Sequence, residues 1–189
     1  MGEEYLTRVV NLRDSLDFLI KSPQINEFSK LTNQCLNAVT NGGRIFFMGN
    51  GGSAAEATHI AAEFVSKCCV DHEPWPAMAL NDSISAITAI SNDYGFEEIF
   101  SRQIKAFANS KSVVIGLSTS GKSRNVLRGL ETAKELGAVT SLWTSEQSPQ
   151  ESNKSIDIKL IAPTISTPRA QEIHLLWGHA LAEVIEGVL

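Results

Sequence analysis

The sequence has few cysteines, no excess of positive charge and no long apolar run, and each shortage argues against a class of protein. The three cysteines, Cys35, Cys68 and Cys69, contain no C-x-x-C pair, so we expect reduced thiols in a cytosolic protein rather than a disulfide framework. The 16 basic and 21 acidic side chains give a net charge of −5, which argues against a broad nucleic-acid-binding face. No apolar run approaches the roughly 18 residues of a membrane span, and the acidic N-terminus does not resemble a signal peptide. We therefore expect a cytoplasmic protein without nucleic-acid or membrane partners.

The sequence does contain a regular alternation of strand and helix patterns. Its 189 residues, of which 43% are hydrophobic, are enough for one domain with a core of ordinary size. Apolar side chains at helical spacing predict two N-terminal helices before Gly43. Short apolar runs then follow at 44–48, 77–80, 112–117, 138–143 and 156–161, and helical stretches at 53–67, 83–91, 96–108, 122–136 and 169–187.

This alternation is typical of a parallel sheet that is covered by helices on both faces. We predict a single α/β domain over 1–189, with a helical extension over about 1–42 and an α/β core over about 43–189. The core should be a three-layer sandwich with a five-stranded parallel sheet in flavodoxin-like order and a long C-terminal helix. Such sheets bind ligands beyond the carboxyl ends of their strands, so the residues just after the strands are candidates for a site.

The loop after the first expected strand, GNGGS (49–53), is suited to binding an anion. Its glycines let the backbone approach a ligand, and a helix with free amides follows. The stretch 49–54 also fits the dinucleotide pattern G-x-G-x-x-A. That alternative needs an acidic residue about 20 positions later, where Cys69 stands.

The loop after the third expected strand reads GLSTSGKS (116–123) and has two interpretations. In the first, Ser118, Thr119 and Ser120 surround a phosphate with their hydroxyls at the start of a helix. In the second, the letters are a P-loop, in which Lys122 reaches the phosphates and Ser123 holds magnesium. A P-loop NTPase also needs an Asp after another apolar strand, and the later strands supply none.

Two expected helices carry side chains that could bind a divalent metal. His59 and Glu63 are four residues apart, so they share one helix face, although a surface ion pair is the simpler interpretation. Gln171 and His179 are eight apart, about two turns, on neighbouring parts of one face of the last helix. Zinc accepts nitrogen and oxygen ligands, but a glutamine ligand is unusual. Between these two, His174 is interpreted as a packing or supporting residue.

Four motifs in this order resemble the sugar isomerase (SIS) family, and within it the isomerases of seven-carbon sugar phosphates. They are GNGGSAAEATHIAAEF, SNDYGFEEIFSRQ, GLSTSGKS and PRAQEIHLLWGH. The resemblance covers nearly the whole chain and implies the SIS fold. It implies substrate-binding residues at Asn50, Gly51, Gly52, Ser53, Glu63, Asn92, Asp93, Ser118, Thr119, Ser120, Ser123 and Gln171. It also implies one zinc ion per subunit, bound by His59, Glu63, Gln171 and His179, and a homotetramer whose active sites use residues of neighbouring subunits.

The activity implied by the resemblance is an aldose–ketose isomerisation. It would convert sedoheptulose 7-phosphate to D-glycero-D-manno-heptose 7-phosphate through an enediol, the first step of bacterial ADP- or GDP-heptose biosynthesis. Glu63 and His179 are the expected base and acid, in either assignment, and Glu63 would also be a zinc ligand. The alternatives are a SIS protein without catalysis, which binds phosphosugars or associates with a replication initiator, and a P-loop NTPase.

Overall fold

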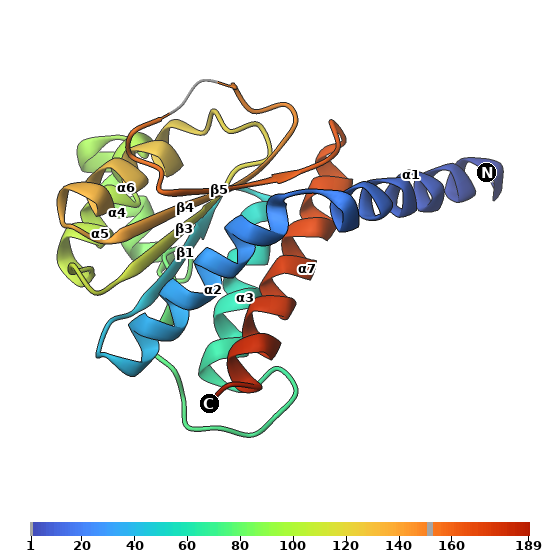
Figure 1. Cartoon of the computed structure of the whole chain (residues 1–189). Coiled ribbons are helices and arrows are strands. Elements are labelled where there is room, and N and C mark those ends of the chain that lie inside the picture. Colours follow the sequence, from blue (N-terminus) through green and yellow to red (C-terminus); the bar gives the residue numbers. More distant parts are fainter. Residues whose placement is uncertain (1, 151–152) are drawn as a thin grey trace.

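The computed structural model describes residues 2–150 and 153–189, and its centre is one parallel sheet of five strands (Figure 1). The strands are β1 (Ile45–Gly49), β2 (Ala77–Ala79), β3 (Val113–Leu117), β4 (Val139–Ser145) and β5 (Ile158–Ala162). They lie in the order β2-β1-β3-β4-β5, which confirms the predicted flavodoxin-like sheet. In this order the carboxyl ends of β1 and β3 are neighbours, because Gly49 pairs with Leu117. The two loops that were expected to bind anions therefore start side by side.

The helices form the two outer layers and the N-terminal extension. They are α1 (Gly2–Lys21), α2 (Gln24–Thr40), α3 (Gly52–Val65), α4 (Ile84–Tyr94), α5 (Ser101–Phe107), α6 (Arg124–Glu135) and α7 (Thr167–Glu186), with a 3-10 turn, η1, at Phe96–Glu98. The single helix expected over 96–108 is wrong in its first part, because the α-helix begins only at Ser101. The Ser101 hydroxyl donates a hydrogen bond to the carbonyl oxygen of Glu98, which closes the short 3-10 turn before the helix.

The core consists of two hydrophobic clusters, one on each face of the sheet. Successive side chains of a strand point to opposite faces, so Ile45 and Phe47 join the cluster beneath α2, α3 and α7. Phe46 and Met48 join the cluster beneath α4, α5 and α6. Every residue of β1 and β3 is buried. The sheet is thus the middle of three layers, as predicted, and it holds the starts of α3 and α6 at one edge.

Helix α1 extends away from the rest of the domain (Figure 1). Only Ser15 of this helix is buried, and the inner turns contact the domain through partly buried leucines. The Arg169 guanidinium on α7 also donates a hydrogen bond of 2.9 Å to the carbonyl oxygen of Arg8. Several large apolar side chains of α1 remain exposed, namely Tyr5, Leu6, Val9, Val10, Phe18 and Ile20.

Candidate active site

Helices α3 and α7 lie side by side, and a cluster of two histidines and one glutamate bridges them. His59 and Glu63 come from one face of α3, as their spacing predicts, and His179 faces them from α7. The Nε2 atom of His59 lies 2.8 Å from the Nε2 atom of His179 and 3.4 Å from Oε1 of Glu63. The structure therefore brings together the expected acid and base, which are 116 residues apart in sequence (179 − 63).

This cluster fits a small divalent cation. One ring nitrogen from each histidine and one carboxylate oxygen all lie within 4.8 Å of one another. Zinc binds such atoms at about 2.0–2.2 Å, so tetrahedral ligands are roughly 3.3 Å from one another. Small side-chain movements would bring the three atoms to those distances. The side chain of His59 is 49% exposed and that of Glu63 is 19% exposed, so the cluster is open to solvent on one side.

Gln171, the fourth expected ligand, lies at the other end of the same helix pair. Its side-chain nitrogen packs against Gly52, where an added Cβ would come within 2.3 Å of it. Because Gln171 and His179 are eight residues apart, about 12 Å along the helix axis separates them. The structure therefore joins three of the four expected ligands, and Gln171 as a fourth ligand stays a prediction.

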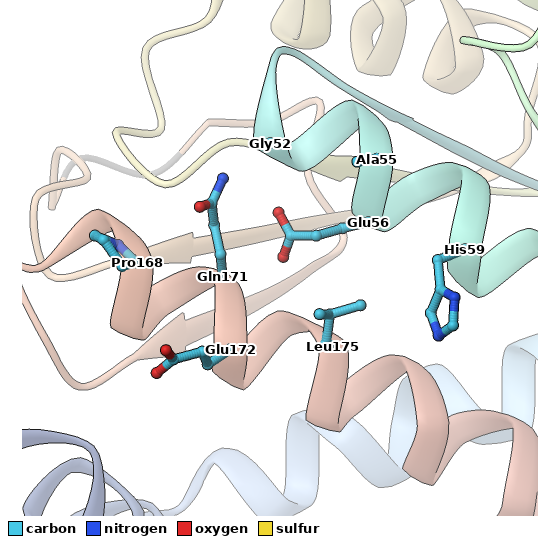
Figure 2. A pocket seen from close by; sticks show the side chains of 8 residues that line it. All are labelled: Gly52, Ala55, Glu56, His59, Pro168, Gln171, Glu172 and Leu175. Carbon is cyan, nitrogen blue, oxygen red and sulfur yellow. The ribbon is translucent and has the colours of Figure 1, made fainter. Parts of the chain in front are cut away.

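A pocket of about 490 Å³ runs along the helix pair between Gln171 and His59 (Figure 2). It is lined by Gly52, Ala55, Glu56, His59, Pro168, Gln171, Glu172 and Leu175. Glu56, which the sequence analysis did not single out, points from α3 toward α7 in the middle of this pocket. Only 5% of Glu56 is exposed, and neither carboxylate oxygen has a hydrogen-bond partner among the described residues.

The buried carboxyl group of Glu56 is matched by a buried histidine on α7. Oε1 of Glu56 lies 3.6 Å from Nδ1 of His174, and the other ring nitrogen of His174 is 3.2 Å from the carbonyl oxygen of Thr144. Burial raises the pKa of Glu56 to about 7, although the Ser53 hydroxyl acts in the opposite direction. Burial also lowers the pKa of His174 to about 4, opposed by the Thr144 carbonyl. A neutral acid beside a neutral imidazole follows at pH values between these two pKa values.

The glycine loop is fixed in place by Asn81 and Asn125, two asparagines that the sequence alone did not single out. Asn50 and Asn125 exchange two side-chain hydrogen bonds of 2.8 Å each, which tie this loop to the first turn of α6. The side chain of Asn81, just after β2, bonds both the N–H and the carbonyl oxygen of Gly49. Of the expected binding residues in this loop, Ser53 is buried in the first turn of α3 and Gly51 precedes that helix.

The serine loop is a tight turn between β3 and α6, as expected of a phosphate-binding turn. The buried Ser118 hydroxyl donates to the Ser123 hydroxyl at 2.9 Å, and the Ser120 hydroxyl accepts from the Lys122 amide at 3.2 Å. Gly121 has a φ of +64°, and an added Cβ there would come within 2.2 Å of the Ser148 hydroxyl. Glycine is therefore required at the turn, whereas the Lys122 side chain is exposed.

The backbone of the serine loop is held by the end of β4. The carbonyl oxygen of Thr119 accepts hydrogen bonds from the backbone and the hydroxyl of Ser145. This attachment fixes the loop without using the hydroxyls of Ser118, Ser120 and Ser123. The hydroxyls of the turn are thus available to rearrange around an anion.

Asn92 and Asp93 lie at the C-terminal end of α4 and are exposed. The Asn92 amide donates a hydrogen bond of 2.8 Å to the Asp93 carboxylate. No hydrogen bond joins either residue to another expected site residue within residues 2–150 and 153–189. Their proposed contact with substrate therefore stays a prediction.

Residues 7–145, more than half of the chain, match the family model described as the SIS domain. The chain belongs to the SIS domain family. Among its relatives, a phosphoheptose isomerase of Thermodesulfovibrio yellowstonii is 43% identical over 165 residues, which cover 87% of this chain and 80% of the relative. A phosphoheptose isomerase of Helicobacter pylori is 39% identical over 184 residues, which cover 97% of this chain and 93% of the relative.

The SIS fold is also confirmed by solved structures. The structure of a phosphoheptose isomerase from Neisseria gonorrhoeae superposes with a TM-score of 0.89 and 31% identity, covering 98% of each chain. Within the SIS domain family, this chain therefore groups with the phosphoheptose isomerases. The letters GLSTSGKS form the serine loop of a SIS domain, and the later strands β4 and β5 end at Ser145 and Ala162 without the aspartate that an NTPase requires.

No helix among the described residues is both long and apolar enough to cross a bilayer.

Proposed function

We propose that this protein is a phosphoheptose isomerase, which interconverts sedoheptulose 7-phosphate and D-glycero-D-manno-heptose 7-phosphate. The observation that carries the proposal is the cluster of His59, Glu63 and His179, which places a carboxylate and an imidazole together across α3 and α7. The relatives named phosphoheptose isomerase support the choice of substrate. The product would enter the synthesis of nucleotide-activated heptose.

The reaction moves one proton between two adjacent carbons and one between two oxygens. In our proposal Glu63 removes the proton from the carbon beside the carbonyl group and returns it to the neighbouring carbon. His179 gives a proton to the carbonyl oxygen and takes one from the adjacent hydroxyl, so both residues end in their starting states. Positioned groups of this kind each contribute about 10²–10⁴-fold to a rate.

One zinc ion per subunit would be held by His59, Glu63 and His179, with Gln171 as the expected fourth ligand. When bound there, zinc would supply charge stabilisation for the oxygens of the enediolate. A ligand role lowers the basicity of Glu63, so holding the metal and removing the proton compete for one carboxylate. The exposed side of His59 leaves room for the sugar to approach this cluster.

The phosphate group would bind at the serine loop, through the hydroxyls of Ser118, Thr119, Ser120 and Ser123. The sugar chain would then pass the glycine loop, Asn50 to Ser53, toward Glu63, with Gln171 against Gly52. Asn92 and Asp93 complete the proposed binding set. Binding energy from the distant phosphate would position the reacting carbons.

We also propose that the protein is a homotetramer whose active sites use residues of neighbouring subunits. The exposed apolar side chains of α1 support an assembled state, since the domain itself covers only its inner turns. An apolar groove of about 350 Å³ continues this surface. It is lined by Leu19, Ile20, Gln24, Ile25, Phe28, Leu176, Trp177 and Ala180.

The deciding experiment compares Glu63→Gln with Glu172→Gln in an assay of aldose formation from sedoheptulose 7-phosphate. Glu63→Gln keeps the shape of the side chain and removes its basicity, so turnover should be lost while the melting temperature stays the same. Glu172→Gln changes a carboxylate that lines the pocket outside the cluster and pairs with Arg169, so most activity should remain. Near-normal turnover in Glu63→Gln would refute the assigned base.

A SIS protein that binds phosphosugars or a replication initiator without catalysis is the second candidate. The same assay separates the two, because such a protein would bind the sugar phosphate and form no aldose. The presence of Glu63 and His179 in one cluster favours the enzyme.

A further inference from the structure

A second group of metal-binding side chains lies beside the proposed active site. The thiols of Cys68 and Cys69 and the carboxylate of Glu183 place one ligand atom each within 4.8 Å of one another. Glu183 follows His179 by four residues, so it lies one turn further along the same face of α7. The two cysteines lie just beyond the end of α3, in the segment that leads to β2. None of the three residues takes part in the proposed isomerisation.

The segment that carries the two thiols is anchored by a buried carboxylate. Glu186, on the last turn of α7, accepts hydrogen bonds from the backbone N–H groups of Cys68, Cys69 and Val70, at 2.7, 3.0 and 3.1 Å. The same carboxylate lies 3.4 Å from Nε2 of His72. Only 9% of Glu186 is exposed. The positions of the thiols relative to α7 are therefore fixed by the backbone and not by the thiols themselves.

The electrostatic surroundings of the thiols favour a cation. The carboxylate of Glu183 lies beside the two thiols, and that of Glu186 lies at the backbone N–H groups of the same two cysteines. Negative groups that oppose a thiolate stabilise a positive ion at the same place. Two sulfur atoms and one carboxylate oxygen form a ligand set that zinc accepts, with zinc–sulfur distances of about 2.3 Å. Soft thiolate ligands also select thiophilic ions over magnesium or calcium.

We propose that Cys68, Cys69 and Glu183 form a second metal site, which takes a thiophilic divalent ion such as zinc or cadmium. The site is separate from the His59, Glu63 and His179 cluster because the two share no ligand. Three protein ligands leave a position open for water or for a further donor. Metal binding here involves no redox step: each thiol loses a proton to solvent and forms a bond to the ion.

The test is a cadmium titration of the reduced protein, followed by bound metal per chain and by the ultraviolet absorption of cadmium–thiolate bonds. The native protein should bind one cadmium ion more than the Cys68→Ser/Cys69→Ser variant, and only the native protein should show the thiolate band. Cys35→Ala is the matched control, because Cys35 is fully buried and its removal should leave the band intact. His179→Ala should also keep the band, since it affects only the other cluster.

A thiolate band that is absent from the native protein, or one that survives in the double serine variant, would overturn the proposal. Glu183→Gln provides a second measurement with both thiols in place, and it should weaken cadmium binding at the thiol site. An unchanged dissociation constant for cadmium in that variant would show that Glu183 is not a ligand of this site. These outcomes do not depend on isomerase activity, so they are independent of the proposed function.

Discussion

The helix pair α3 and α7 differs chemically from the two loops at the ends of β1 and β3. The helix pair carries imidazole and carboxyl groups, with His59, Glu63 and His179 at one end and a buried carboxyl–imidazole pair in the middle. Apart from the exposed Lys122, the loops offer uncharged amides and hydroxyls, joined by the hydrogen bonds between Asn50 and Asn125. Proton transfer needs groups that titrate, whereas an anion can be held by neutral donors at a helix start.

The helix pair would therefore transfer protons, and the two loops would bind the substrate. Changes on the helix pair should act on turnover or on titration, and changes in the loops should act on substrate affinity.

The largest effect is expected at the exposed end of the helix pair, for His179→Gln. Loss of the imidazole removes the proposed acid and one metal ligand, so turnover should fall by about 10²–10⁴-fold. The melting temperature should change little, because His179 is only partly buried. Steady-state kinetics measures turnover and KM, and thermal unfolding measures the melting temperature. A large rise in KM with normal turnover would show that His179 binds the substrate and does not transfer the proton.

The second prediction concerns titration of the buried pair and uses Glu56→Gln. The pKa of Glu56 is about 7 in the folded protein, above the ordinary value of 4.5. Its stabilising contribution is therefore fully present below about pH 4.5 and is lost as the pH rises through 7. Glutamine does not titrate, so between pH 5 and 8 the variant should gain stability relative to the native protein, on the order of 3 kcal/mol.

Urea unfolding of both proteins at several pH values measures this difference. The titration of His174 is present in both proteins and largely cancels in the comparison. A stability difference that is the same at pH 5 and pH 8 would show that Glu56 is not titrating in this range.

A smaller effect is expected in the loops, for Asn125→Ala. The substitution removes both hydrogen bonds to Asn50 and leaves the Asn50 amide without its partner, at a cost of about 1–3 kcal/mol. The glycine loop would lose its attachment to α6, so KM should rise by about tenfold while turnover is kept. A fall in turnover with unchanged KM would contradict the division between the two regions.

The smallest effect is expected for Lys122→Ala, in the loop that matches the P-loop pattern. The Lys122 side chain is exposed, and surface substitutions of this kind usually change the free energy of unfolding by no more than about 0.5 kcal/mol. No proposed contact with substrate or metal involves Lys122, so isomerase activity should change by no more than about twofold. Magnesium-dependent nucleotide hydrolysis that disappears in this variant would instead support the NTPase interpretation.

Much of the fold was predictable because it depends on local patterns. Continuous apolar runs located all five strands, and the pairing of His59 with Glu63 follows from their helical spacing alone. The 3-10 turn at Phe96–Glu98 was missed because its sequence has ordinary helical periodicity, and the hydrogen bond from the Ser101 hydroxyl to the Glu98 carbonyl oxygen joins residues that no periodicity relates.

The rest of the site depends on contacts between distant parts of the chain. Asn50 and Asn125 are 75 residues apart, and neither position has a spacing that predicts the other. Glu56 looks like an ordinary polar residue of a helix until α7 covers it and places His174 opposite. His179 was singled out by its spacing to Gln171, but only the resemblance to the SIS family joined it to His59 and Glu63, because spacing does not relate α7 to α3.

The projecting helix α1 depends on its surroundings for stability more than the other helices do. It contains 20 residues, and in proteins most of a helix's stability comes from the packing of its apolar face against other elements. With only Ser15 buried, the outer turns have few contacts of their own to hold them. In the homotetramer proposed above, neighbouring subunits would hold the outer turns of α1. Dilution should therefore melt these turns before the α/β core unfolds, and the helical content should fall with protein concentration.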